Sequence, residues 1–301
     1  MKHFIFLTIV TIWKVLPFKL FHSKIIRAFP EIQRKLYQDL RYKGVMEIQI
    51  EKKSFKLFNP GFSTIENDIF WLGIENGWEK ISMKLWIELV KHANTVLDIG
   101  ANTGVYSLVA ATVNNKANVY AFEPVKRTSE IFKQNLELNP NLKIQLVEKA
   151  VSNADSVAQF YDLPTDSQYS ASLNAEMLAT FPNRISYDVE TVRLDSFFDM
   201  KNQKIDVIKL DVEMHEPEAI EGMIELIKKN HPTFLIEILN PLIAERVQQL
   251  LKEIDYLCFS IDEENPPKFI GKIEQSEFHN LLLIKKDKLD QVGLFIPELS
   301  K

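Results

Sequence analysis

The chain has 301 residues, of which 46% are hydrophobic and 26% charged, and its formal net charge is −5. This composition excludes disordered and fibrous proteins and is sufficient for one large domain or two small ones. The negative charge argues against a nucleic-acid surface built on bulk positive charge. The only cysteine, Cys258, cannot form an internal disulfide and lacks zinc-ligand spacing, so a reducing, cytoplasmic compartment is expected.

Residues 1–43 form an apolar and basic segment that is predicted to be helical. Its stretch "FIFLTIVTIWKVLPFKLF" is interrupted by Lys14, Pro17 and Lys19, and is too short for a bilayer span of about 20 apolar residues. No good cleavage site of a secretory signal follows. Two roles are mainly open: peripheral membrane contact through residues 4–27, with the basic side chains at the headgroups, or docking on the domain or on a second copy in a homo-oligomer. An uncleaved membrane anchor is the third and least favoured alternative.

Residues 44–93 are predicted to form a hairpin and a helix that cap the following domain. The stretch "VMEIQIEKKSFKLFN" alternates apolar and polar residues around a polar centre, which is typical of a β-hairpin. From about Glu79, apolar residues recur at helical spacing, so an amphipathic helix is expected there.

Residues 94–301 alternate between strand-like and helix-like stretches, which predicts an α/β domain with a parallel sheet and helices on both faces. Seven strands are expected, at 95–100, 118–123, 143–148, 205–211, 233–239, 257–262 and 280–286. Helices are expected from Val105 and over 126–138, 216–229 and 241–254. The segment 151–194 is polar, with only short strand candidates at 158–161 and 187–194, and a loop of that length is usually functional.

The turn after the first of these strands reads "DIGANTG", from Asp98 to Gly104. In a dinucleotide site the turn is Gly-x-Gly-x-x-Gly, and its second glycine lets the backbone approach a pyrophosphate. Asn102 stands at that place here, and an acid ends the strand, which suits a ligand that carries a cation where the phosphates would lie. S-adenosylmethionine is such a ligand. Glu123, at the end of the second strand, is predicted to hold its ribose hydroxyls.

Five motifs, "VLDIGANTGVYSL", "VYAFEPV", "EKAVSN", "VETVRLDSFF" and "IDVIKLDVEMHEPEAIEGM", resemble the successive motifs of the FkbM family of S-adenosylmethionine-dependent methyltransferases. The similarity runs from about residue 65 to residue 239. It implies a Rossmann-like class I methyltransferase fold, with a seven-stranded, mostly parallel sheet whose last strand is antiparallel. It also implies methylation of oxygen on sugars, lipids or polyketide products. One departure is Met214, which follows Glu213 where the family pattern has a glycine. If that glycine serves a positive backbone angle or a close approach of the substrate, Met214 is expected to narrow or reshape the pocket.

The candidate site residues fall into two groups. Those expected to bind the cofactor are Asp98, Gly100, Ala101, Asn102, Gly104, Glu123, Pro124 and Ala150. Methylating an alcohol also needs a general base, or a metal that lowers the alcohol's pKa. The candidates for this chemistry are Lys209, Asp211, Glu213, His215 and Glu237.

Several of these roles have alternatives. His215 is either a general base or a structural residue at a helix N-terminus, and Lys209 either serves the site or forms a structural ion pair. Asp211, Glu213 and Glu237 together form a candidate magnesium site. The hydroxyls of Tyr169, Ser170 and Ser172 are expected in the wall of the acceptor site.

The resulting prediction is an O-methyltransferase that acts on a hydroxyl of a sugar, glycolipid or secondary metabolite and does not bind nucleic acid. Three alternatives are an N-methyltransferase, a nicotinamide dehydrogenase, and a catalytically silent cofactor-binding scaffold. An N-methyltransferase would tolerate alanine at Asp211, and the position of Asn102 disfavours the dehydrogenase.

Overall fold

The computed structural model describes residues 11–13, 16–17, 19–27, 37–163, 171–199 and 203–294. Its central element is a sheet with the strand order β12-β11-β13-β10-β9-β3-β4-β5. The strands are β3 (Thr95–Ile99), β4 (Asn118–Phe122), β5 (Ile144–Val147), β9 (Val207–Leu210), β10 (Thr233–Glu237), β11 (Leu257–Ser260), β12 (Lys268–Phe269) and β13 (Asn280–Ile284).

The predicted seven strands are confirmed, and so is the antiparallel last strand. β3 pairs in parallel with both β4 and β9, whereas β13 is antiparallel to β10 and β11. The sheet has one strand more than predicted, because β12 pairs with the edge strand β11. β12 has two residues, both exposed, and so short a strand carries no detectable hydrophobic period.

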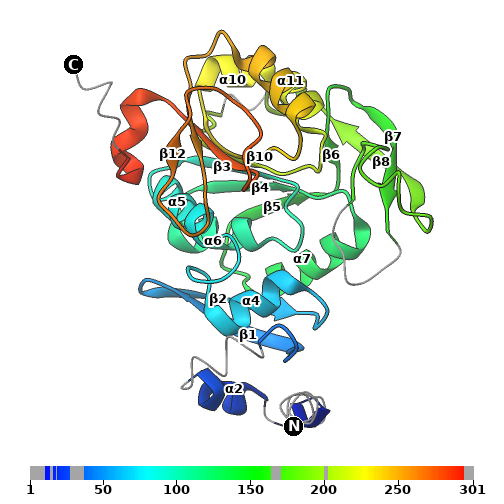
Figure 1. Ribbon diagram of the computed structural model, residues 1–301, viewed down its shortest axis with the longest axis vertical. Coiled ribbons are helices and arrows are strands. Elements are labelled where there is room, and N and C mark those ends of the chain that lie inside the picture. Colours follow the sequence, from blue (N-terminus) through cyan, green and yellow to red (C-terminus); the bar gives the residue numbers. More distant parts are fainter. Residues whose placement is uncertain are drawn as a thin grey trace.

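Helices cover both faces of the sheet (Figure 1). Along β3, Val96 packs in one core cluster with residues of α5 (Lys80–Val90) and α6 (Val105–Val113). Leu97 packs in another with residues of α9 (Glu216–Glu221), α10 (Ile224–Asn230) and α11 (Pro241–Leu251). The helices of this domain are α6 (Val105–Val113), α7 (Lys126–Leu138), α8 (Leu194–Asp199), α9 (Glu216–Glu221), α10 (Ile224–Asn230), α11 (Pro241–Leu251) and the 3₁₀-helix η1 (Lys286–Val292).

Two helices differ in how well the sequence predicts them. α11 begins as expected, since the side chain of Asn240 accepts a hydrogen bond from the Ile243 N–H at 3.0 Å and Pro241 occupies the first turn. The single helix predicted over 216–229 is wrong, because the chain breaks between α9 and α10. Gly222 lies at this break and packs so closely on the chain that a Cβ there would come within 1.9 Å of the Ser152 carbonyl oxygen.

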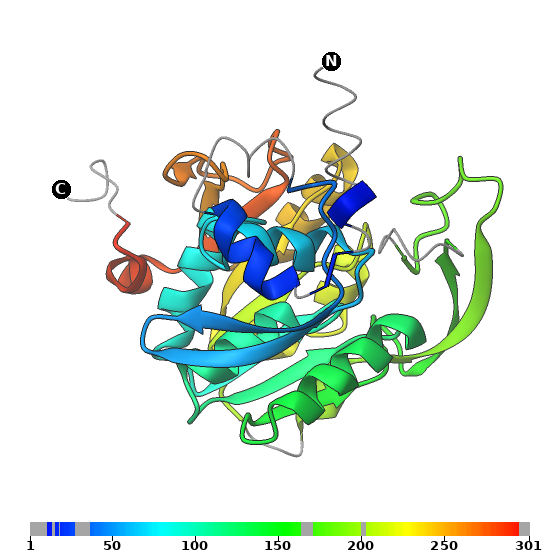
Figure 2. The same cartoon turned by 90° about the horizontal axis from the view of Figure 1, so that it is seen from below.

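The segment before the sheet contains α2 (Lys19–Arg27), β1 (Gly44–Ile50), β2 (Lys53–Asn59), α4 (Thr64–Leu72) and α5 (Lys80–Val90). The predicted hairpin is confirmed, with Gly44 opposite Asn59 and Ile50 opposite Lys53. The hairpin lies below the sheet domain in Figure 1 and in front of it in Figure 2. The Phe58 N–H in β2 donates a hydrogen bond to the Asn135 side chain in α7. The helix expected from about Glu79 is α5. The domain boundaries at residues 43 and 93 stay predictions.

The polar segment 151–194 contains more regular structure than predicted. β6 (Ala150–Val151), β7 (Ser156–Asp162) and β8 (Ile185–Val192) form a second sheet in the order β6-β8-β7. The β7–β8 hairpin projects at one side of the molecule (Figure 2). The strand expected at 158–161 was therefore too short, and the one expected at 187–194 was shifted along the chain, because antiparallel pairing of β7 with β8 supports strand structure through polar residues.

In the part of the chain that the structure describes, no helix is long and apolar enough to cross a membrane.

Candidate active site

A cavity of about 490 Å³ lies at the carboxyl ends of β3, β4, β9 and β10, the edge at which open α/β sheets bind ligands. Of the thirteen predicted site residues, Gly104 alone is not part of its lining; the residues that line it are Asp98, Gly100, Ala101, Asn102, Glu123, Pro124, Ala150, Lys209, Asp211, Glu213, His215 and Glu237. Gly104 instead packs against Phe132 in α7, because a Cβ at this position would lie only 2.2 Å from the Phe132 ring.

The glycine turn between β3 and α6 is held by both neighbouring strands. The N–H groups of Gly100 and Ala101 both donate to the Phe122 carbonyl at the end of β4, each at 3.0 Å. Gly100 has φ +82°, and a Cβ at this position would stand 1.7 Å from the carbonyl oxygen of Asp211. Gly100 is therefore required for its backbone angle and for its contact with the chain just after β9.

The carboxylate of Glu123 binds the glycine turn directly. It accepts hydrogen bonds from the N–H groups of Asn102 and Val125, both at 2.8 Å, and from the Thr128 hydroxyl at 2.9 Å. Burial raises the pKa of Glu123 to about 7. Because its carboxylate occupies the turn amide that a pyrophosphate would need, the site disfavours a dinucleotide.

The groups in this part of the cavity fit S-adenosylmethionine. Asp98 is buried, accepts a hydrogen bond from the Ser107 hydroxyl at 2.6 Å, and has its pKa raised to about 6 by burial. The side-chain oxygen of Asn102 is buried and has no hydrogen-bond partner among the described residues. These acceptors suit a ligand that brings donors, such as an ammonium group and ribose hydroxyls.

Lys209, in β9, is the central charged residue in the part of the cavity away from the glycine turn. Its side chain is only 2% exposed, and its Nζ lies 3.1 Å from Asp211 Oδ2 and 5.3 Å from the centre of the Tyr106 ring. Burial lowers the pKa of Lys209, but the negative charges of Asp211, Glu79 and Glu237 outweigh burial, so its pKa is raised. Lys209 therefore remains an ammonium group, as a buried charge does only when it is paired.

Glu79 belongs to this cluster, although no signal in the sequence pointed to it. It immediately precedes α5 in the left-handed conformation (φ +46°), lines the cavity, and accepts a hydrogen bond from the Tyr106 hydroxyl at 2.5 Å. Burial raises its pKa. An acid before a helix is common, so only its burial near Lys209 and its hydrogen bond from Tyr106 distinguish Glu79 from an ordinary surface residue.

Glu66 is a second residue that sequence reasoning missed in part. Ser63 and Glu66 form the Ser-x-x-Glu pattern of a capping box, which is visible in the sequence. The structure adds that Glu66 is fully buried and accepts a hydrogen bond from the Thr103 hydroxyl at 2.5 Å. This contact ties α4 to the glycine turn.

Three carboxylates converge where β9 and β10 end. One oxygen from each of Asp211, Glu213 and Glu237 lies within 4.8 Å of the others, close enough to share a divalent cation. Burial, and then the charge of Asp211, raise the pKa of both Glu213 and Glu237. Both glutamates therefore hold a proton more strongly than exposed ones do.

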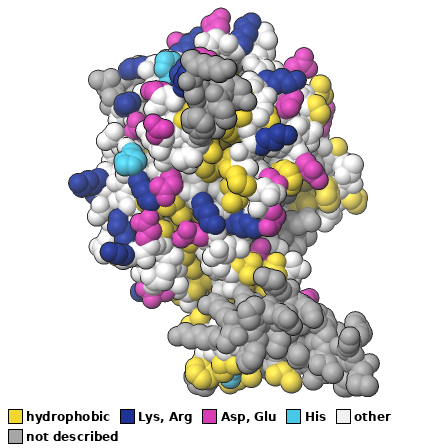
Figure 3. Space-filling view, turned by 60° about the vertical axis from the view of Figure 1, so that its left-hand side comes forward, with side chains coloured by type: hydrophobic (Ala, Val, Ile, Leu, Met, Phe, Trp, Pro, Cys, Tyr) yellow, Lys and Arg dark blue, Asp and Glu magenta, His cyan; other side chains and the backbone are white. Residues whose placement is uncertain are grey.

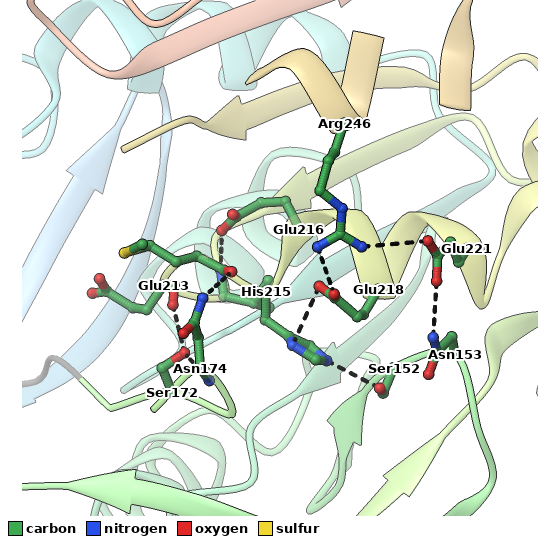
Figure 4. Close-up of polar contacts among 12 residues, drawn as sticks. Ser152, Asn153, Ser172, Asn174, Glu213, His215, Glu216, Glu218, Glu221 and Arg246 are labelled. Carbon is green, nitrogen blue, oxygen red and sulfur yellow. Dashed lines mark hydrogen bonds and ion pairs between the residues drawn. The ribbon is translucent and has the colours of Figure 1, made fainter. Parts of the chain in front are cut away.

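The departure at Met214 falls in a strained turn. Glu213 and Met214 have φ of +55° and +71°, a region that costs a non-glycine residue about 1–2 kcal/mol. The Ser172 hydroxyl donates to the Glu213 carbonyl at 2.5 Å, and the Asn174 amide donates to the Met214 carbonyl at 3.1 Å (Figure 4). Met214 thus adopts the positive angle that a glycine would take freely, and Ser172 holds the turn. Tyr169 and Ser170 lie outside the described residues.

His215 has polar contacts at both ring nitrogens (Figure 4). Its Nε2 lies 3.0 Å from the Ser152 hydroxyl, and its Nδ1 lies 3.5 Å from the Glu218 carboxylate, which also binds Arg246 at 2.7 Å. Burial lowers the pKa of His215. A general base needs a free nitrogen that faces the acceptor, so this geometry favours the structural alternative for His215.

The cavity and its glycine turn lie within a recognised domain. Residues 98–260 match the family model described as the methyltransferase FkbM domain, which is more than half of the chain. The chain belongs to the FkbM methyltransferase family. The predicted resemblance is confirmed, and with it the class of S-adenosylmethionine-dependent methyltransferases.

Two curated relatives of this FkbM protein are enzymes of the same kind. It is 27% identical over 146 residues to the hexuronic acid methyltransferase AglP of Haloferax volcanii, covering 48% of this chain and 56% of the relative. It is 26% identical over 156 residues to the methyltransferase sdnD of Sordaria araneosa, covering 43% of this chain and 60% of the relative. The chain therefore spans little more than half the length of these relatives.

Solved structures similar to this chain include the methyltransferase FkbM of Methylobacillus flagellatus, with 14% identity and a TM-score of 0.40, covering 64% of this chain and 44% of the other. Another is an S-adenosylmethionine-dependent O-methyltransferase of Thermotoga maritima, with 14% identity and a TM-score of 0.40, covering 68% and 63% of the two chains.

Proposed function

We propose that this FkbM protein transfers a methyl group from S-adenosylmethionine to a hydroxyl group of a small polar acceptor, namely a sugar, a glycolipid or a secondary metabolite. The observation that carries the proposal is that the Lys209–Asp211 ion pair lines the same cavity as the glycine turn and Glu123. A methyl donor and a proton acceptor would then share one enclosed site.

On this proposal the part of the cavity around the glycine turn and Glu123 holds the cofactor. Glu123 receives the ribose hydroxyls, Asp98 faces the ammonium group, and Pro124 and Ala150 line the adenine. The cofactor supplies an electrophilic methyl group. Since positive charge on sulfur disappears as the methyl group moves, orientation of the acceptor and removal of one proton are the main tasks of the chain.

Asp211 is the proposed general base. Lys209 holds Asp211 Oδ2 at 3.1 Å, and the acceptor hydroxyl gives its proton to the carboxylate as the new oxygen–methyl bond forms and the sulfur–methyl bond breaks. The products are a methyl ether and S-adenosylhomocysteine. Asp211 is the main group that keeps Lys209 an ammonium group, and Glu79 and Glu237 add to this effect when they are ionised.

A divalent cation such as magnesium is an addition to this proposal. Asp211, Glu213 and Glu237 could bind it through one oxygen each, and it would lower the pKa of the acceptor hydroxyl. An N-methyltransferase and a catalytically silent cofactor-binding scaffold remain alternatives. An N-methyltransferase would depend less on general-base catalysis by Asp211. A silent scaffold would bind the cofactor without turnover.

The charge of the cavity favours a neutral or cationic acceptor. Among the described residues that line it, the basic ones are Lys149, Lys209 and His215, and burial lowers the pKa of His215. Lys149 is paired with Glu190 at 2.7 Å, and Lys209 with Asp211. A carboxylate on the acceptor would therefore meet acids without a free cationic partner among these residues. A cytoplasmic location is part of the proposal, because Cys258 is a buried free thiol.

Isothermal titration of the purified chain with S-adenosylmethionine, S-adenosylhomocysteine and NAD, each with and without magnesium, tests the cofactor assignment. Micromolar affinity for both sulfur ligands and none for NAD is expected. If neither S-adenosylmethionine nor S-adenosylhomocysteine binds, in a sample whose circular dichroism shows a folded protein, the proposal is overturned. A change in affinity on adding magnesium would support the cation site.

A further inference from the structure

The N-terminal helix α2 is attached to the protein through one face. Ser23 is buried and Ile26 packs against the core. Just before the helix, the buried Trp13 donates a hydrogen bond to the Arg41 carbonyl at 2.7 Å, and its ring lies 5.4 Å from that of Trp71 in α4. These contacts fix α2 beside α4 and β1, at one extremity of the molecule (Figure 1).

The opposite face of α2 is apolar and exposed. Leu20, Phe21 and Ile25 are 47%, 63% and 49% exposed. Phe21 and Ile25 are four residues apart, so they share a helical face. Figure 3 shows hydrophobic side chains gathered at the lower end of the molecule, beside residues that are not described. A groove of about 800 Å³, lined in part by Leu20 and the exposed Val45, continues this surface between α2 and the hairpin.

The charge of this segment is opposite to that of the whole chain. Residues 1–30 contain four lysines and one arginine and neither aspartate nor glutamate, although the net charge of the chain is −5. Two of these cations, Lys19 and Lys24, directly precede Leu20 and Ile25 in the sequence. An apolar face combined with local cationic residues is typical of helices that lie in the interface of an anionic membrane.

We infer that α2 is a membrane-binding element whose exposed face, Leu20, Phe21 and Ile25, inserts into the headgroup region of an anionic lipid surface. Ser23 and Ile26 face the protein while the outer face enters the lipid. A second copy of the chain fits this face less well, since two segments without acidic residues would repel each other. A nucleic acid does not account for this face, because Leu20, Phe21 and Ile25 would make no favourable contacts with its phosphate backbone. The inference does not depend on the proposed methyl transfer.

Co-sedimentation of the full chain with lipid vesicles tests this inference. The vesicles consist of phosphatidylcholine mixed with a smaller share of phosphatidylglycerol in one arm and of phosphatidylcholine alone in the other. We compare the wild type with the triple variant Leu20→Ser, Phe21→Ser, Ile25→Ser. The matched control is Leu242→Ser with Val157→Ser, because these two apolar residues are 71% and 63% exposed on α11 and β7, away from α2.

The wild type and the control should bind the anionic vesicles, with weaker binding to phosphatidylcholine alone and in high salt. The triple variant should lose at least about tenfold in partition coefficient, while its thermal melting stays that of the wild type. Equal binding by wild type and triple variant, or no binding by the wild type, would overturn the inference. So would a wild-type dimer in sedimentation velocity that the triple variant converts to a monomer without any binding to vesicles.

Discussion

The carbonyl oxygen of Asp211 occupies the space in which a side chain at Gly100 would begin, because a Cβ on Gly100 would lie only 1.7 Å from it. The cofactor turn and the proposed catalytic acid are thus in direct backbone contact, although they lie far apart in the sequence. Any side chain at position 100 must push the chain after β9 away, and with it Asp211.

The variant Gly100→Ala tests this contact. We expect a loss of about 1–2 kcal/mol from the positive φ and about 1–3 kcal/mol more from the overlap, together with loss of cofactor binding. Gly73→Ala is the matched control, since Gly73 has φ +83° and an open space where its Cβ would stand. Urea unfolding and calorimetric titration measure both effects; equal losses in the two variants would refute the role of the contact.

A second prediction concerns the pH dependence of stability. The folded-state pKa of Glu123 is about 7, against an ordinary value of 4.5. The stability that this group contributes is therefore fully present below about pH 4.5 and is lost as the pH rises through 7. In the cofactor-free protein, Glu123→Gln should remove this decline, which amounts to at most about 1.4 kcal/mol per pH unit.

Urea unfolding at several pH values between 5 and 8 measures this slope. Glu130→Gln, an exposed substitution in the neighbouring helix α7, serves as the control and should leave the slope unchanged. Glu123→Gln should also weaken binding of S-adenosylmethionine by about 10- to 100-fold, because charge-assisted hydrogen bonds to the ribose are replaced by weaker ones. Wild-type affinity in this variant would contradict the ribose assignment.

A third prediction follows from the burial of Lys209. Lys209→Met leaves Asp211, Glu79 and Glu237 without their cation, so the protein should lose about 3–5 kcal/mol of stability at pH 8. The loss should shrink at pH 5, because burial raises the pKa of Glu79 and this carboxylate takes up a proton as the pH falls. Lys149→Met removes a partly exposed ion pair with Glu190 and should change stability by about 0–1 kcal/mol. A loss for Lys209→Met that is the same at both pH values would argue against this coupling.

The fourth prediction separates O-methylation from N-methylation. Asp211→Asn should lower kcat by about 10²- to 10⁴-fold, which is the usual contribution of a general base, while affinity for S-adenosylmethionine stays within about twofold. The measurement is transfer of a radiolabelled methyl group to a panel of sugars and amines, beside calorimetric titration. Wild-type turnover on an amine by the variant would show that Asp211 is not needed as a base.

Features encoded within a few neighbouring residues were predictable from the sequence. The seven strands, the hairpin and the start of α11 follow from hydrophobic period and capping residues, and the structure confirms them. The glycine turn and Glu123 could also be found, since strand, turn, helix and second strand follow one another along the chain. The break at Gly222 could not, because the groups that surround this glycine, the Ser152 carbonyl and the Asp195 N–H that donates to the Gly222 carbonyl at 3.0 Å, belong to earlier parts of the chain.

The sequence by itself therefore determined the α/β class, the family motifs, and the set of acids at the ends of the strands. Only the tertiary structure decided which side chains meet. It placed Glu79 of the N-terminal region beside Lys209, bound both ring nitrogens of His215, and left the apolar face of α2 exposed. The physical reason is the separation along the chain of the residues that interact. Helix and strand periodicity depends on residues that are neighbours in sequence. Burial and charge pairing depend on elements that are distant in sequence and meet only when the core packs.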